Sequence, residues 1–187
     1  MNTVLLINLI KIRWIAIVGQ LTTLFTIFFV FNFTIPLIEC LFVVALSILV
    51  NFYSYFIQRG NLTLTDKKTF LFLLFDISQL VGLLFLTGGV FNPFVVLILA
   101  PIIISASYLS ALWTILLSLY SIFLILIINF NYIPLNWEQN FIIPLIYNIG
   151  ILVALIITII FIAIYAYLFA SSARKISSAL SATELKL

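Results

Sequence analysis

Long apolar segments take up most of this chain and constrain its fold more than any other feature. Six of them are long enough, or nearly so, to cross a bilayer of about 30 Å, which takes about 20 helical residues. Backbone polar groups inside lipid must be paired within their own segment, so each span should be an α-helix. The sequence therefore predicts an all-α integral membrane protein, a bundle of six transmembrane helices. The predicted spans lie near residues 13–33, 36–57, 70–87, 94–109, 112–130 and 142–170.

Composition excludes a water-soluble domain. Only 7% of the residues are charged and 66% are hydrophobic, whereas roughly 25% of the residues of a soluble domain carry charge. So few polar groups cannot cover the surface of a soluble fold. The surface of this chain must therefore face the lipid bilayer. The net charge of +3, from eight basic residues, is no signal of nucleic-acid binding.

The chain has no histidine and a single cysteine, Cys40. The usual haem and zinc ligands are therefore missing, as is any histidine that could accept a phosphoryl group. No nucleophile–base pair, phosphate-binding loop or metalloprotease motif is present. We expect no metal site and no catalytic residue in these residues. Cys40 is interpreted as a small apolar residue near a helix start, with an intermolecular bridge or a redox thiol as the alternatives.

Basic residues mark one side of the predicted bundle. They fall before the first span, between the second and third, and after the sixth, and the connections at 34–36, 88–93 and 131–141 contain none. Lys11 and Arg13 are interpreted as the charges that precede the first helix. The positive-inside rule then places both termini in the cytoplasm.

Asp76 is an unusual residue because it lies well inside the predicted third span. An acidic group there costs about 2.5–3.5 kcal/mol on insertion scales, so it should face the bundle interior, a polar partner or water. Gln79 and Thr87 share its helical face and extend a polar stripe. Either Asp76 bonds a neighbouring helix, through Gln20 or Asn51, or the stripe is a proton or redox relay that serves a ligand.

The stretch that follows the third span has the residues of a tight turn. Gly88 and Gly89 permit the positive φ values of a reversal, Asn92 suits a helix N-cap, and Pro93 suits the first helical position. A plain turn would explain all of them. Alternatively, the rings of Phe91 and Phe94 could sandwich a flat ring, with the Asn92 amide and free helix N–H groups donating to its carbonyl oxygens.

The end of the chain shows a heptad-like pattern. Ala173, Ile176, Leu180, Thr183 and Leu187 repeat at 3-4-3-4 spacing, which indicates a short dimeric coiled coil or a frayed amphipathic helix. We divide the chain into a transmembrane sensor domain, 1–170, and the start of a cytoplasmic linker helix, 171–187. The pattern stops without a terminator, so we expect the chain to continue beyond it.

These motifs resemble the membrane region of the RegB/PrrB/ActS redox-responsive sensor histidine kinases. The strongest similarity is the run DISQLVGLLFLTGGVFNPFVVLILAP, from Asp76 to Pro101, which contains a GGxxNPF motif. RWIAIVGQ, from Arg13 to Gln20, and ALSATELKL, from Ala179 to Leu187, are supporting similarities. The similarity extends over essentially all six predicted helices.

The resemblance implies a function. In that family the motif between helices three and four is implicated in binding ubiquinone, whose redox state or occupancy regulates autophosphorylation. It implies a quinone site at Gly88, Gly89, Asn92, Pro93 and Phe94, to which the local chemistry above adds Phe91. It further implies a homodimer in the bacterial inner membrane that signals to a response regulator. The kinase core and phosphoacceptor histidine have no counterpart in these residues, so the chain is not catalytic alone.

Two other functions remain open at the level of sequence. A small proton-coupled permease or carrier would use Asp76 as its coupling acid, although no clear internal repeat supports it. A quinone-handling subunit of a respiratory complex is the other, and the lack of histidine for haem argues weakly against it.

Overall fold

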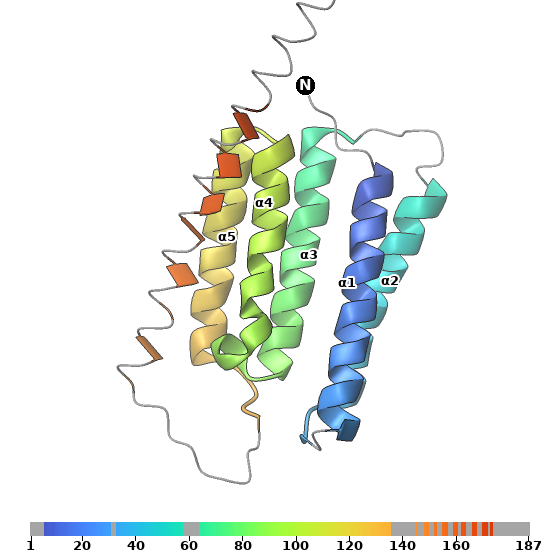
Figure 1. Ribbon diagram of the computed structural model, residues 1–187, viewed down its shortest axis with the longest axis vertical. Coiled ribbons are helices and arrows are strands. Elements are labelled where there is room, and N and C mark those ends of the chain that lie inside the picture. The colour runs from blue at the N-terminus through green and yellow to red at the C-terminus, as the bar shows by residue number, and fades with distance from the viewer. Residues whose placement is uncertain are drawn as a thin grey trace, which may run out of the picture.

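The computed structural model describes residues 6–30, 33–57 and 64–135, together with single positions between 145 and 173. The described part is all-helical (Figure 1). The helical elements, in chain order, are α1 (Leu6–Phe25), the π-helix η1 (Thr26–Val30), α2 (Leu37–Ile57), α3 (Asp66–Leu86), the 3₁₀ helices η2 (Gly89–Phe91) and η3 (Pro93–Ile98), α4 (Leu99–Tyr108) and α5 (Ala111–Phe130).

Four of these helical stretches are long and apolar enough to cross a membrane: Leu9–Val30, Leu37–Phe56, Asp66–Leu86 and Ala111–Phe130. They correspond to the first, second, third and fifth predicted spans. The fourth predicted span is a shorter apolar helix, Pro93–Tyr108. Its first six residues are 3₁₀ helix, which rises further per residue, so it reaches about 27 Å. The sixth predicted span lies mostly outside the described residues, and its described positions are helical. The C-terminal heptad pattern lies outside them as well, apart from Ala173.

The helices form two groups. α1 packs mainly on α2, while α3, α4 and α5 pack on one another, and α2 also contacts α3. Figure 1 shows α1 and α2 together on one side and α3 to α5 on the other. The starts of α1 and α3 lie at one end of the bundle, and the turn between α3 and α4 lies at the opposite end.

The core follows this division. One cluster of buried side chains joins α3, α4 and α5, with Leu73, Ile77, Ile102 and Leu117 fully buried. A second cluster joins α1, α2 and α3 and includes Cys40, which is fully buried near the start of α2, as the sequence predicted. Hydroxyl groups add a contact within the α3–α5 group, where Ser105 Oγ of α4 and Thr114 Oγ1 of α5 lie 3.1 Å apart. Small polar residues of this kind allow helices to approach closely in lipid.

Candidate functional site

The turn between α3 and η3 has the backbone that its glycines predict. Gly88 has φ 104° and Gly89 has φ 62°, which confirms the predicted reversal. A side chain at position 89 would also clash with its neighbour, because a Cβ atom on Gly89 would lie 2.6 Å from Cγ of Tyr132. The backbone N–H of Gly88 donates to the Ile133 carbonyl at 3.1 Å, so the turn is fastened to the segment after α5.

Asn92 caps η3, as the sequence predicted. Its Oδ1 accepts from the Phe94 backbone N–H at 2.9 Å, and Pro93 occupies the first turn. Its Nδ2 donates to the Thr87 carbonyl at 2.9 Å and to Thr87 Oγ1 at 2.8 Å. The expectation that this amide is a free donor is therefore wrong, because both of its hydrogens are needed to close the turn.

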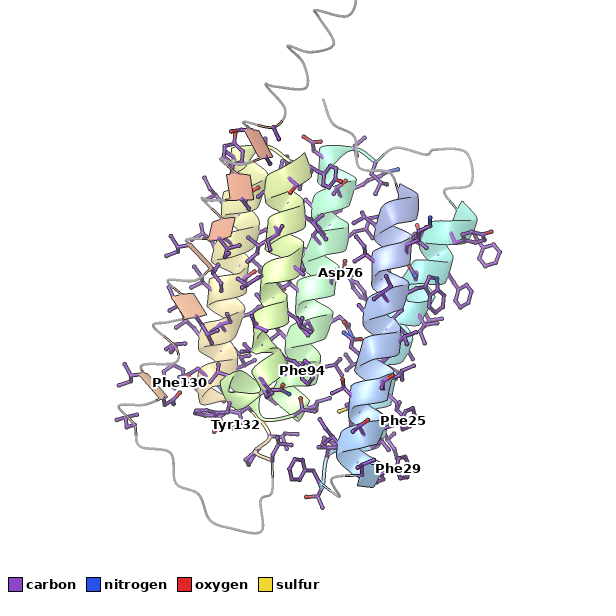
Figure 2. The ribbon with its side chains drawn as sticks, in the orientation of Figure 1. Phe25, Phe29, Asp76, Phe94, Phe130 and Tyr132 are labelled. Carbon is purple, nitrogen blue, oxygen red and sulfur yellow. The ribbon has the colours of Figure 1, made fainter. Side chains whose placement is uncertain are left out.

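The two phenylalanines of the turn do not face each other. The Phe91 ring packs against Tyr132, with ring centroids 5.8 Å apart. Phe94 is 40% exposed and lines a groove beside α1. The predicted aromatic sandwich is wrong, because the Phe91 ring packs on Tyr132 while the Phe94 ring lines the groove. Figure 2 shows Phe94 and Tyr132 near this end of the bundle.

A groove runs between α1 and the α3–η3–α4 side of the bundle, and it has two adjoining parts. The turn part has a volume of about 290 Å³ and the ion-pair part about 260 Å³. Ile15, Ala16, Gln20, Leu80 and Leu97 line both parts, which makes them continuous. The turn part is further lined by Gly19, Thr23, Leu24, Ile27, Leu83, Leu84, Thr87, Asn92 and Phe94. The ion-pair part is further lined by Leu9, Ile12, Arg13, Ile17, Ser47, Leu73, Asp76, Gln79, Ala100, Pro101 and Ile104.

The groove opens on the side of the bundle. Its rims are exposed: Ile15 of α1 is 73% exposed, and Leu97 of η3 is 46% exposed. Both rim residues are apolar and lie within apolar helical stretches. Within the described part of the chain, the groove is therefore open laterally to a molecule dissolved in the bilayer.

Two polar pairs cross the groove from α1 to α3. Gln20 and Gln79 form a reciprocal amide pair, with N–H···O distances of 3.2 and 3.1 Å. Arg13 forms a bidentate ion pair with Asp76, in which Nε lies 2.8 Å from Oδ1 and Nη2 lies 3.1 Å from Oδ2. The guanidinium also lies 5.2 Å from the centroid of the Phe72 ring. Figure 2 shows Asp76 on the α3 side that faces α1.

Arg13 corrects two sequence interpretations. It does not precede the first helix but lies inside α1, where it is 5% exposed; Lys11 lies inside α1 as well. Asp76 does bond a neighbouring helix, but its partner is Arg13 and not Gln20 or Asn51. Asn51 instead donates to the Ile10 carbonyl. Arg13 and Gln20 are seven residues apart, which is two helical turns, so the spacing itself could have placed both on the face that meets Asp76 and Gln79.

The predicted site residues therefore separate into two sets. Asp76, Gln79, Thr87, Asn92 and Phe94 line the groove, whereas Gly88, Gly89, Phe91 and Pro93 shape the turn and are not among its lining residues. The sequence interpretation missed the contribution of α1, which supplies Ile15, Ala16 and Gly19. Among the described residues, no group of three or more acidic or cysteine side chains could hold a metal ion.

Comparison with known proteins adds the decisive observation. The chain is 34% identical over 182 residues to the sensor histidine kinase RegB of Cereibacter sphaeroides, and the match covers 96% of this chain. The chain is homologous to RegB. The predicted resemblance is thereby confirmed. A second RegB sequence from the same species is 35% identical over 73 residues. No family model and no solved structure matches the chain. The chain spans 39% of the length of RegB, so it corresponds to part of a longer relative.

Proposed function

We propose that this chain is the membrane sensing region of a redox-responsive sensor histidine kinase and that its groove binds a lipid-soluble quinone, such as ubiquinone. The observation that carries the proposal is a laterally open apolar groove that ends at the GGxxNPF turn, in a chain homologous to RegB. The match to RegB favours a signalling role over a small carrier. The coupling acid that a carrier would need, Asp76, is already paired with Arg13.

The chemistry of the groove suits a quinone. Its walls are mostly apolar, which accommodates an isoprenoid tail, and Phe94 offers a flat ring at one end. Among the polar groups, the Gln20–Gln79 pair can orient a polar head. Ligand sites commonly combine these two features, an apolar lining and a small number of placed polar groups.

The arrangement of the helices suggests how occupancy becomes a signal. A ligand shifts a conformational equilibrium only when it binds two states with different affinity. Here the groove separates α1 from α3, and two polar pairs bridge it. A quinone accepts hydrogen bonds, whereas a quinol also donates them, so the two forms would favour different spacings of α1 and α3. The proposed route then leads through the sixth span, at 142–170, to the kinase core.

The proposed orientation places the termini in the cytoplasm of a bacterium, with the bundle in its inner membrane. Lys11, Lys67 and Lys68 support it, because all three are exposed near the starts of α1 and α3, at the end of the bundle opposite the turn. Dimerisation through residues 171–187 and phosphotransfer to a response regulator by a downstream kinase core belong to the same proposal.

Binding of a photoreactive ubiquinone analogue to the purified chain in nanodiscs tests the proposed site. Phe94→Ala removes a ring that lines the groove, and the affinity should fall about tenfold, which corresponds to about 1.4 kcal/mol. Phe130→Ala is the matched control, because Phe130 is 77% exposed and does not line the groove. Equal affinities for the wild type and Phe94→Ala, with no label on α1 or η3, would refute a quinone site in this groove.

A further inference from the structure

The hydrogen-bonding capacity of the turn is largely used up within the turn. Asn92 donates both amide hydrogens to Thr87 and accepts from the Phe94 backbone. Thr87 Oγ1 accepts from Asn92 and donates its hydrogen to the Leu83 carbonyl at 2.7 Å. A hydroxyl group has one hydrogen and two lone pairs. The side chains of Asn92 and Thr87 therefore have no hydrogen left to donate to a quinone carbonyl.

The Gln20–Gln79 pair has the capacity that the turn lacks. Each amide uses one hydrogen and one acceptor position in the reciprocal pair. A glutamine amide has two hydrogens and two acceptor positions, so each residue retains one donor and one acceptor for a ligand. The pair is neutral, and a ligand can therefore engage it without separating charges. Gln79 is only 8% exposed, and a hydrogen bond made at this depth is poorly screened by solvent.

The position of the pair is equally suitable. Gln20 lines both parts of the groove, at the place where they adjoin. Along α3, Gln79 lies roughly 12 Å from Thr87 and roughly 5 Å from Asp76. The pair therefore lies between the turn and the ion pair, nearer to the ion pair. Arg13 and Asp76 already form charge-assisted hydrogen bonds with each other, and they line only the ion-pair part of the groove.

We propose that the Gln20–Gln79 amide pair, and not Asn92, makes the hydrogen bonds to the oxygen atoms of the bound quinone ring. The ring lies in the middle of the groove, and its tail runs through the apolar turn part past Phe94. The pair donates to a quinone carbonyl and accepts from a quinol hydroxyl, so it determines the relative affinity for the two redox forms. This inference rests on the proposed quinone site and names the group within it that recognises the ring.

The test measures binding of decylubiquinone, decylubiquinol and decylbenzene to the chain in nanodiscs. Decylbenzene has the same tail but no ring oxygens. Gln20→Leu and Gln79→Met should each weaken decylubiquinone binding about five- to tenfold, the effect of one lost hydrogen bond. Binding of decylbenzene should stay unchanged. Asn131→Leu is the matched control, because it removes an exposed amide that does not line the groove.

Each outcome bears on one of the two proposals. If the wild type does not bind decylubiquinone, or if Phe94→Ala binds it equally well, the quinone site itself is refuted. If the Phe94 effect is present but Gln20→Leu and Gln79→Met both bind decylubiquinone as the wild type does, only the role of the amide pair is overturned. The role of the amide pair is also overturned if Asp76→Asn weakens decylubiquinone binding while Gln20→Leu and Gln79→Met do not. Gln20 is partly exposed at the groove, so Gln20→Leu supplies a well-folded variant even if Gln79→Met is destabilised.

Discussion

The Arg13–Asp76 ion pair provides the sharpest test of how the two helical groups are held together. Arg13 is 5% exposed, and both of its hydrogen bonds to Asp76 are between 2.8 and 3.1 Å. Removing one partner of a buried pair leaves an uncompensated charge and costs about 3–5 kcal/mol. Because the Asp76 side chain is 25% exposed, the lower end of that range applies. We expect Asp76→Leu and Arg13→Met each to lower the free energy of unfolding by about 3 kcal/mol.

The double variant separates a pairwise interaction from two independent losses. Replacing a whole buried ion pair by apolar residues of similar volume is often neutral. The variant carrying both Arg13→Met and Asp76→Leu should therefore be destabilised by less than either single variant, within about 1 kcal/mol of the wild type. Reversible unfolding in mixed micelles, followed by circular dichroism, measures all four proteins. Lys67→Met, which removes an exposed cation at the start of α3, controls for loss of positive charge. Additive losses in the double variant, about 6 kcal/mol, would refute the coupling.

Two further predictions concern the turn. Gly89→Ala should lower the free energy of unfolding by about 2 kcal/mol or more, because the φ of Gly89 is +62° and the new Cβ would overlap the Tyr132 ring. Gly19→Ala is the control in the same unfolding assay. A Cβ at Gly19 would have no atom within 4 Å, so this variant should not be destabilised. Asn92→Ala should cost about 1–2 kcal/mol through loss of the cap and of both bonds to Thr87, and an unchanged midpoint of thermal unfolding would contradict the assigned role of Asn92.

Local chemistry was enough to predict the turn. Gly88 and Gly89 have the positive φ values, and Asn92 accepts the capping bond from the Phe94 N–H. Both features follow from properties that these residues carry wherever they occur. The side chains that line the groove depend instead on contacts between segments distant in sequence. Which aromatic ring faces it depends on the segment after α5, because Tyr132 takes up the Phe91 ring. Nothing in the residues around Phe91 indicates that partner.

The sequence by itself determined that the chain is a helical membrane protein. Apolar length and scarcity of charge leave a backbone no other way to satisfy its hydrogen bonds in lipid. It also determined that Asp76 needs a partner, because a carboxylate within a span is costly on its own.

Only the tertiary structure decided what that partner is and where a ligand can enter. From the sequence, Arg13 looks like a charge that flanks the first helix. In the structure α1 lies opposite α3, so that Arg13 pairs with Asp76 and Gln20 with Gln79. The groove likewise exists because α1 packs mainly on α2 and leaves its other face apart from α3. Such pairings depend on how helices distant in sequence are placed, and short-range patterns of residues do not contain that information.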